Sequence, residues 1–137
     1  GKKMDQETIL VVDDEKCVRD LVCIMLRNRG HRVVEAEDAD SAVVRLTAEK
    51  APDCIILDAM LPGRTGFELC EELKGDPRYR AVPIAIVSGI AAGSLHGDEQ
   101  CRKQSAADDF IAKPFRLGEL VARIEKLMLP TAAARVA

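Results

Sequence analysis

Aromatic side chains are scarce in this sequence: among 137 residues there is no tryptophan, one tyrosine and three phenylalanines. Proteins that bind single-stranded nucleic acid stack the bases on aromatic side chains, and this chain has no such platform. Positive charge is not in excess either, because 20 lysines and arginines stand against 23 aspartates and glutamates. A nucleic-acid-binding domain usually carries a basic patch. We therefore expect no direct binding of nucleic acid by this domain.

Long apolar runs and paired cysteines are also missing. No run approaches the roughly 20 apolar residues of a membrane-spanning helix, and residues 1–7 are not typical of a signal peptide. The five cysteines form no Cys-x-x-Cys pair, and their odd number argues against a secreted disulfide scaffold. Most lie at apolar periodic positions, where free thiols act as small hydrophobic side chains. A zinc or redox role is the less favoured alternative, and we expect a soluble, cytoplasmic protein without membrane contact.

The chain does contain a regular alternation of short apolar runs and segments of helical periodicity. The apolar runs predict strands near residues 8–13, 32–36, 53–58, 83–88 and 109–112. The periodic segments predict helices near residues 16–28, 41–50 and 66–74, within 94–107, and at 116–128, before Pro130. Strict alternation of this kind is typical of an α/β fold, a doubly wound five-stranded parallel sheet with helices on both faces.

The length fits one domain with a single sizeable core. We expect residues 1–7 to be a disordered or cloning-derived leader, and residues 8–129 to form the folded domain. Residues 130–137 begin with a proline and contain an alanine run without a strand pattern. They are predicted to be a C-terminal tail or the start of a linker.

Reactive side chains follow four of the predicted strands. Asp13 and Asp14 come directly after the first strand, and Asp58 ends the third. Ser88 ends the fourth strand, and Lys113 follows the fifth. The carboxyl ends of parallel strands meet at one edge of a sheet, where ligands bind. The sequence therefore predicts that three carboxylates, one hydroxyl and one ammonium meet in one crevice.

This set of groups suits the chemistry of phosphate. Three carboxylates so close together cannot all stay ionised unless a cation joins them or some take up protons. Oxygen ligands favour Mg²⁺, whereas zinc is disfavoured because the crevice offers no thiolate or imidazole. An aspartate beside a divalent cation can attack phosphorus, and Lys113 would supply a second cation. The Ser88 hydroxyl could donate a hydrogen bond to the same phosphoryl group.

Each of these residues also has a purely structural explanation. Asp13 or Asp14 could cap the helix that follows. Ser88 could be an ordinary turn serine, and Lys113 before Pro114 could be a surface lysine at a helix start. The recurrence of reactive groups at one edge of the sheet favours the functional interpretation.

Four stretches of the sequence resemble the receiver domain of bacterial two-component response regulators, over residues 8–129. They are Ile9–Glu15 with Arg19 downstream, Asp58–Gly63 with Gly66, Ser88–Gly89, and Ala107–Phe115. The resemblance implies a flavodoxin-like sheet with strand order 2-1-3-4-5. It also implies a signalling domain and not an enzyme, one that catalyses only its own phosphorylation and dephosphorylation.

The resemblance further implies that Asp58 is the phosphoacceptor. The phosphoryl group would come from a phosphohistidine of a sensor histidine kinase or a phosphotransfer protein. Asp14 and Asp58 would bind Mg²⁺ directly together with the main-chain carbonyl of Met60, while Asp13 would act mainly through water.

Other positions are implied to transmit the signal. Lys113 would pair with the acidic cluster before phosphorylation and with the phosphoryl group after it. Ser88 and Phe110 would form a switch pair. The fourth helix, fifth strand and fifth helix would present the output face to a downstream domain or protein, and a second copy of the chain is a further candidate partner.

Two features depart from the pattern of that family. Glycines at 89, 93 and 97 predict a late start of the fourth helix, near Asp98. Ala106 stands where the family usually has glycine, so the end of the same helix is expected to differ.

Hydrophobic Met60 and Ile90 flank the expected site and predict slow attack of water on an acyl phosphate.

Three other functions compete with this interpretation. A phosphohydrolase of the haloacid dehalogenase type needs a second aspartate two positions after the nucleophile, where this chain has Met60. A nucleotide-binding module needs a glycine-rich loop after the first strand, where this chain has Asp13, Asp14 and Glu15. The serious alternative is a receiver-like interaction module that signals without phosphorylation.

Overall fold

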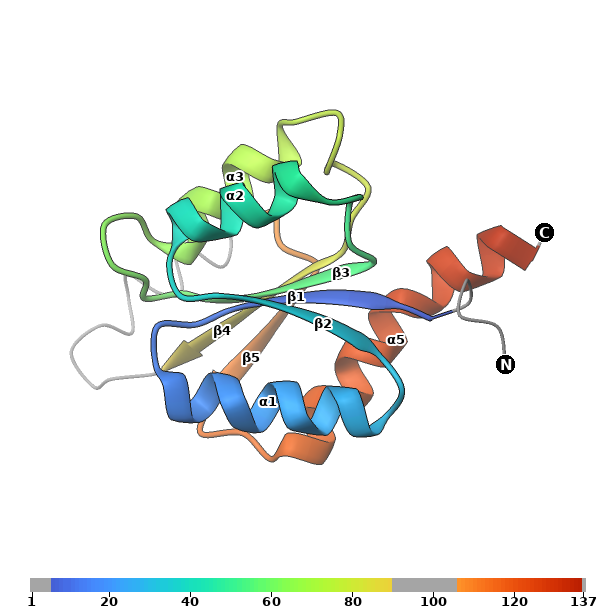
Figure 1. Cartoon of the computed structure of the whole chain (residues 1–137), viewed down its shortest axis with the longest axis horizontal. Coiled ribbons are helices and arrows are strands. Elements are labelled where there is room, and N and C mark those ends of the chain that lie inside the picture. The colour runs from blue at the N-terminus through green and yellow to red at the C-terminus, as the bar shows by residue number, and fades with distance from the viewer. Residues whose placement is uncertain (1–5, 90–105, 137) are drawn as a thin grey trace.

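The computed structural model describes residues 6–89 and 106–136. Strands and helices alternate over residues 8–89, and a further strand and helix lie within residues 106–136 (Figure 1). The strands are β1 (Thr8–Val12), β2 (Arg32–Ala36), β3 (Cys54–Asp58), β4 (Ile84–Gly89) and β5 (Asp109–Lys113). The helices of the described residues are α1 (Lys16–Asn28), α2 (Ala39–Ala48), α3 (Gly66–Lys74) and α5 (Leu117–Val136).

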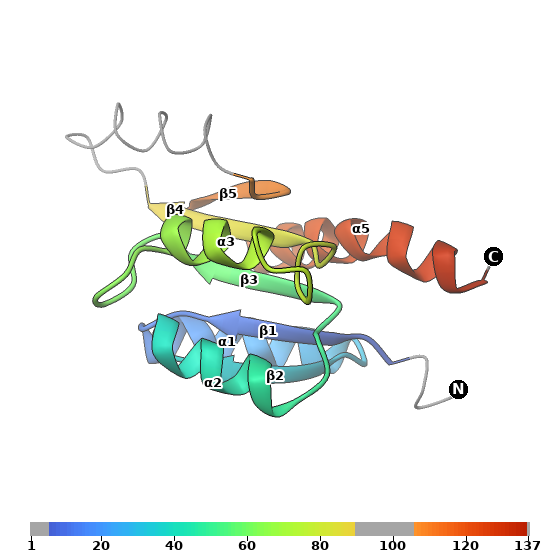
Figure 2. The same cartoon turned by 90° about the horizontal axis from the view of Figure 1, so that it is seen from above.

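The strands form one parallel sheet in the order β2-β1-β3-β4-β5 (Figure 2). The predicted doubly wound fold and the implied strand order are therefore confirmed. Helices α2 and α3 cover one face, and α1 and α5 cover the other (Figure 1). Because every strand runs in the same direction, the carboxyl ends of all five lie at the same edge.

The core has two layers, one on each face of the sheet. Along β1, Leu10 and Val12 belong to the layer under α2 and α3, whereas Ile9 and Val11 belong to the layer under α1 and α5. All four side chains are at most 2% exposed. Burial on both faces explains why the central strands β1, β3 and β4 are nearly continuous apolar runs without polar alternation. The result is a rigid support for the residues at the strand ends.

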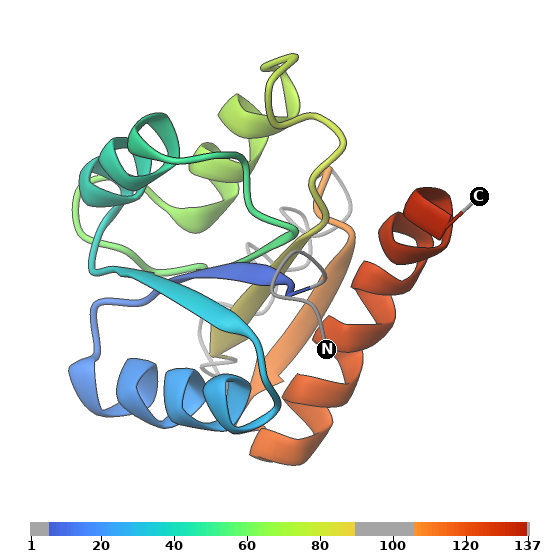
Figure 3. The same cartoon turned by 45° about the vertical axis from the view of Figure 1, so that its right-hand side comes forward.

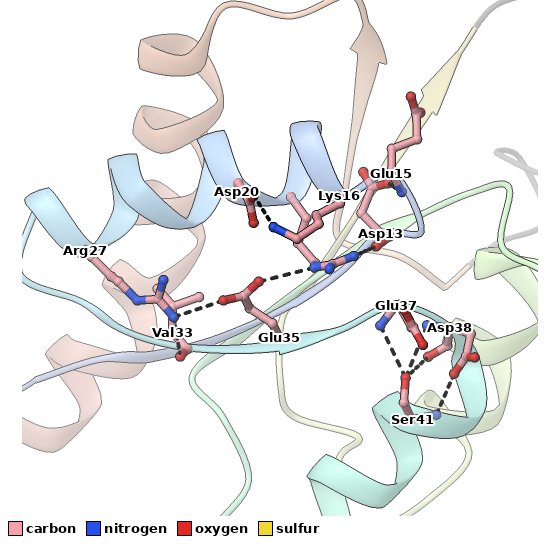
Figure 4. Close-up of polar contacts among 11 residues, drawn as sticks. Asp13, Glu15, Lys16, Asp20, Arg27, Val33, Glu35, Glu37, Asp38 and Ser41 are labelled. Carbon is pink, nitrogen blue, oxygen red and sulfur yellow. Dashed lines mark hydrogen bonds and ion pairs between the residues drawn. The ribbon is translucent and has the colours of Figure 1, made fainter.

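Two helices begin with capping boxes, and this moves one boundary from its predicted place. Asp38 caps α2 by accepting from the main-chain N–H of Ser41 at 2.7 Å, and Thr65 caps α3 by accepting from Glu68 at 3.1 Å. The contacts of Asp38 with Ser41 are visible in Figure 4. Helix α2 consequently starts at Ala39, two residues before the predicted start at residue 41.

The prediction that Pro130 ends the last helix was wrong. Helix α5 continues through this position to Val136, and its C-terminal turns extend beyond the sheet (Figures 2 and 3). Alanine has the highest helix propensity of any residue type, and the alanines at 132–134 favour helix on the C-terminal side of the proline. No helix in the described part of the chain is long and apolar enough to cross a membrane.

The predicted fourth helix, its late start near Asp98 and the glycines at 93 and 97 lie outside the described residues, as do Ile90 and Cys101. Ala106 is described, but the helix end that it was expected to alter is not.

The described residues contain four cysteines, and no disulfide joins them. Cys23, Cys54 and Cys70 are buried, as expected for small hydrophobic side chains, whereas Cys17 is exposed on α1. Burial raises the pKa of the Cys23 and Cys54 thiols to about 12. These two thiols therefore stay protonated and unreactive at neutral pH.

Helix α3 begins in close contact with the end of β3, and this contact leaves no space for a side chain at Gly66. An ideal Cβ atom at Gly66 would lie 2.2 Å from the main-chain oxygen of Asp58. We expect Gly66→Ala to lower the free energy of unfolding by roughly 1 to 3 kcal/mol, the usual cost of overpacking. Urea unfolding followed by circular dichroism measures this change.

Gly118→Ala is the matched control. A Cβ atom at Gly118 would meet no atom within 4 Å, and the residue lies in α5. This substitution should raise the free energy of unfolding by up to about 1 kcal/mol, because alanine favours helix over glycine. Equal stability of the two variants would contradict the close packing of α3 on β3.

Candidate functional site

Three acidic side chains meet at the carboxyl edge of the sheet. Asp58 is the last residue of β3, and Asp13 and Asp14 follow β1, its neighbour in the sheet. One carboxylate oxygen from each of the three lies within 4.8 Å of the others. Asp13 and Asp58 are buried, at 6% and 3% exposure, whereas Asp14 is exposed. The sequence correctly predicted this cluster.

Lys113 brings the compensating positive charge from β5. Its Nζ atom lies 3.4 Å from Asp58 Oδ2 and 3.7 Å from Asp13 Oδ2. A third carboxylate, that of Glu15, lies 3.3 Å from the same Nζ atom. The Lys113 side chain is only 21% exposed, so the view that it is an ordinary surface lysine was wrong. One ammonium is thus shared by the acidic groups of two strand ends.

Main-chain N–H groups fix the two buried carboxylates. The N–H of Glu15 donates to Asp13 Oδ1 at 2.8 Å, and that of Met60 donates to Asp58 Oδ1 at 3.2 Å. The N-cap of α1 is Glu15, whose side chain makes no capping hydrogen bond. Asp13 therefore bonds within its own turn and does not cap α1, so that structural alternative is not supported.

Burial and crowding shift the protonation of this cluster. Burial raises the pKa of Asp13 to about 6, and the nearby charge of Asp58 adds to the rise. The main-chain bond from Glu15 and the charge of Lys113 partly offset it. For Lys113, burial acts to lower the pKa, but the charges of Asp13 and Asp58 outweigh it and raise the pKa above its usual value. The cluster thus favours cations strongly.

Ser88 and Phe110 lie on the two strands beyond Asp58. Ser88 is buried in β4, one residue after Val87, which pairs with Asp58. Phe110 is partly buried in β5, and its ring centre lies 6.3 Å from that of Phe67 in α3. The Phe110 carbonyl accepts a hydrogen bond from Arg123 of α5 at 2.9 Å. Both residues occupy the expected strands, and their role as a switch stays a prediction.

An apolar groove of about 600 Å³ opens beside Lys113. Glu15, Val18 and Leu21 line it from the α1 side, and Pro114, Phe115 and Leu117 from the start of α5. Leu21, one of the apolar residues of this groove, is 54% exposed. The groove is therefore a surface that a protein partner could cover.

Two charged residues beside the cluster had no role in the expectations drawn from the sequence. Arg19 of α1 donates to the main-chain oxygen of Asp13 at 2.7 Å and to Glu35 of β2 at 3.2 Å. Glu35 lies between Arg27 and the turn at Asp13 (Figure 4). Glu35 and Arg32 are the two charged residues of β2, and a charged side chain within a strand is the signal that could have drawn attention to Glu35.

The raised pKa of Asp13 generates a stability prediction. Below a pH of about 4 the carboxyl is protonated in both folded and unfolded chains, and its contribution to stability is lost as the pH rises through about 6. Ionised Asp13 should then cost roughly 1 to 3 kcal/mol at neutral pH. We expect Asp13→Asn to raise the melting temperature of the metal-free protein at neutral pH and to flatten its dependence on pH.

Differential scanning calorimetry in the presence of a chelator measures this effect. Asp40→Asn is the control, because the Asp40 side chain is 98% exposed and should change little. An Asp13→Asn variant no more stable than the native chain at neutral pH would show that the acidic cluster is not under electrostatic stress.

Comparisons with known proteins agree with this geometry. Residues 9–125 match the response regulator receiver domain family. The chain is 43% identical over 123 residues to the phosphate regulon transcriptional regulatory protein PhoB of Escherichia coli (strain K12), covering 88% of this chain and 51% of PhoB. It is 36% identical over 123 residues to the DNA-binding dual master transcriptional regulator RpaA of Synechocystis, covering 90% and 49%. The chain spans about half the length of these curated relatives.

Solved structures show the same fold. The receiver domain of NtrX from Brucella abortus has a TM-score of 0.75 and 35% identity, covering 88% of this chain and 97% of that one. The receiver domain of the sensor histidine kinase PA1611 from Pseudomonas aeruginosa has a TM-score of 0.77 and 29% identity, covering 90% and 98%. That structure has a magnesium ion coordinated in its active site cleft. The chain belongs to the response regulator receiver domain family and is a receiver of two-component signalling.

Proposed function

We propose that Asp58 accepts a phosphoryl group from a phosphohistidine of a sensor histidine kinase or a phosphotransfer protein. The observation that carries this proposal is the position of Lys113, whose Nζ atom lies 3.4 Å from Asp58 Oδ2 within a cluster of three carboxylates. Asp58 is buried, fixed by the Met60 N–H, and placed at the strand end where ligands of such sheets bind. This is an oriented nucleophile beside a fixed cation.

The donor set fits Mg²⁺. Asp13, Asp14 and Asp58 offer only oxygen ligands, and exposed Asp14 leaves the site open to water, which Mg²⁺ usually keeps in part. Asp14, Asp58 and the main-chain carbonyl of Met60 would hold the ion directly, and Asp13 would act mainly through water. When bound, Mg²⁺ neutralises negative charge on the transferring phosphoryl group.

The residues of the chain carry the transfer itself. An oxygen of Asp58 forms a bond to phosphorus while the bond from phosphorus to the imidazole nitrogen of the donor breaks, and the leaving imidazole takes up a proton from solvent. The product is an acyl phosphate on Asp58. Lys113 stabilises the charge that builds on the phosphoryl oxygens, because its ammonium already lies beside the attacking carboxylate.

Ser88 and Phe110 would convert phosphorylation into a change of surface. A phosphoryl group adds about 1.5 to 2 negative charges and three acceptor oxygens, which give the Ser88 hydroxyl and Lys113 new partners. Movement of Ser88 toward the phosphoryl group would make room for Phe110, whose strand is tied to α5 through Arg123. Phosphorylation would then shift the population of an output face formed by the fourth helix, β5 and α5.

Partners follow from the surfaces around the site. The apolar groove beside Lys113 would receive the kinase or phosphotransfer protein. The output face would engage a downstream output domain or protein, or a second copy of the chain, and this domain itself would not bind nucleic acid. We propose a location in the bacterial cytoplasm, and the curated relatives, which are transcriptional regulators, support this proposal.

Within the chain, we propose that residues 8–129 form the receiver, residues 1–7 a leader, and residues 130–137, of which 130–136 continue α5, a C-terminal tail or the start of a linker. The receiver would act as a signalling domain and would catalyse no reaction other than its own phosphorylation and dephosphorylation.

Intact mass spectrometry tests the phosphoacceptor directly. After incubation with Mg²⁺ and acetyl phosphate, we expect one hydroxylamine-labile phosphate adduct on the native chain, because Asp58 is the only carboxylate proposed as the nucleophile. The adduct should be lost in Asp58→Asn and when a chelator replaces Mg²⁺. Asp40→Asn is the matched control and should be labelled like the native chain, because Asp40 is exposed on α2.

An unlabelled native chain, under conditions that label another receiver, would favour the alternative of a phosphorylation-independent interaction module. An adduct that persists in Asp58→Asn would place the nucleophile elsewhere.

Met60 should govern the lifetime of the phosphorylated form. Its side chain is 71% exposed at the position two residues after Asp58, where it would hinder water that approaches the acyl phosphate. We expect Met60→Asn to shorten the half-life, since an amide can hydrogen-bond the attacking water. The decay of the adduct after removal of the donor measures this half-life, and a native half-life no longer than that of the variant would rule the idea out.

A further inference from the structure

We infer that Arg19 and Glu35 form a positioning pair that fixes the Asp13 main chain and thereby sets the affinity of the acidic cluster for a divalent cation. The inference rests on the proposed function, because it concerns the same site. Neither residue belongs to the acidic cluster itself, and both come from elements packed beside it, α1 and β2.

The contacts form a chain from β2 to the acidic turn. Glu35 Oε1 accepts from Arg19 Nε at 3.2 Å, and Arg19 Nη1 donates to the main-chain oxygen of Asp13 at 2.7 Å. The Arg19 side chain is 13% exposed and that of Glu35 33% exposed. The pair is therefore partly shielded from water, where a charge-assisted hydrogen bond is stronger than at the open surface.

The Asp13 main chain is held on one side by β2 and on the other by Arg19 of α1. Its N–H donates to the Ala36 oxygen at 3.1 Å, and its oxygen accepts from Arg19, which Glu35 orients. The described strand β1 ends at Val12, so the regular sheet ladder does not extend to the Asp13 oxygen. The guanidinium of Arg19 thus supplies a hydrogen bond to the first main-chain oxygen beyond the strand, in the turn that carries Asp13 and Asp14.

This support matters because the turn holds like charges together. Asp13 and Asp14 share the turn and face Asp58 at short range, so their repulsion tends to open it. Mg²⁺ demands near-ideal octahedral geometry and tolerates misplaced ligands poorly. Groups behind the ligands commonly set metal affinity by fixing the ligands in place. The contact of Arg19 with the Asp13 main-chain oxygen would act in this way, because it fixes the backbone that carries the two aspartates.

The geometry also requires arginine. The planar guanidinium directs Nε toward Glu35 and Nη1 toward the Asp13 oxygen at the same time. A lysine ammonium at this position would be a single point of charge without this fork. Arg19→Lys keeps the charge and most of the side chain. It therefore separates the loss of the two simultaneous hydrogen bonds from the loss of positive charge.

Arg27 offers a matched control. It donates to the other oxygen of Glu35, Oε2, at 3.2 Å and to the Val33 oxygen at 3.4 Å, on the side of Glu35 away from Asp13 (Figure 4). Its side chain is 48% exposed. Substitution of Arg27 would remove one partner of Glu35 while the contact of Arg19 with Asp13 stays in place.

Titration with Mg²⁺, followed by amide chemical shifts in ¹⁵N NMR spectra, tests the inference. We expect Arg19→Lys and Arg19→Gln each to weaken Mg²⁺ binding about 10-fold, the lower end of the effect of residues behind metal ligands. Arg27→Gln should bind within about 2-fold of the native chain. Glu35→Gln should weaken binding less than Arg19→Gln, and the double variant should resemble Arg19→Gln alone because both residues act in one chain of contacts.

Thermal unfolding of the same variants in chelator separates positioning from stability. A lower melting temperature with an unchanged Mg²⁺ dissociation constant in both Arg19 variants would overturn the inference and leave a purely structural ion pair. Equal weakening by Arg27→Gln would also overturn it. Absence of Mg²⁺ binding by the native chain would overturn the proposed metal site together with this inference, whereas binding by the native chain and equally by the Arg19 variants would overturn the inference alone.

Discussion

The shared contact of the Lys113 ammonium with Asp58 and Asp13 is the interaction on which the site depends. Three carboxylates at one edge of a sheet repel one another, and burial increases the cost of their charge. Lys113 is held 3.4 Å from Asp58 by a strand two places away in the sheet, so the fold itself supplies the neutralising charge. In such a site the carboxylates can change from Lys113 to a bound cation as their partner, and Lys113 can change from the carboxylates to a phosphoryl group.

The rigid sheet and its covering helices keep the carboxylates and Lys113 close together. Apolar layers on both faces bury the central strands β1, β3 and β4 almost completely, so the ends of β1 and β3 cannot move apart to relieve repulsion. Helix α3 starts against the main chain of Asp58, which leaves room only for glycine at position 66. On the other flank, Arg19 and Glu35 connect the acidic turn to β2. Packing, backbone contact and a charged pair thus restrain the same few residues from three directions.

The sequence predicted the sheet and the acidic cluster well because both follow from local patterns. Apolar runs marked the strands, and reactive residues at their ends had to meet once the strands were parallel. The sequence predicted two helix boundaries wrongly: α5 continues through Pro130 to Val136, and the Asp38 cap starts α2 two residues before the predicted start. It also could not reveal the contact of Arg19 with Asp13, since a bond between a side chain and a turn has no period along the chain.

A double-mutant cycle for Lys113→Met and Asp58→Asn, measured as free energies of unfolding in chelator, tests the central claim most directly. If the ammonium compensates the buried carboxylates, the two substitutions should show a favourable coupling of about 1 to 3 kcal/mol between the native side chains. Addition of Mg²⁺ should reduce this coupling, because the ion would compete with Lys113 for the same charge. Additive effects within about 0.3 kcal/mol in chelator would contradict the account, since the fold would then hold the carboxylates without help from Lys113.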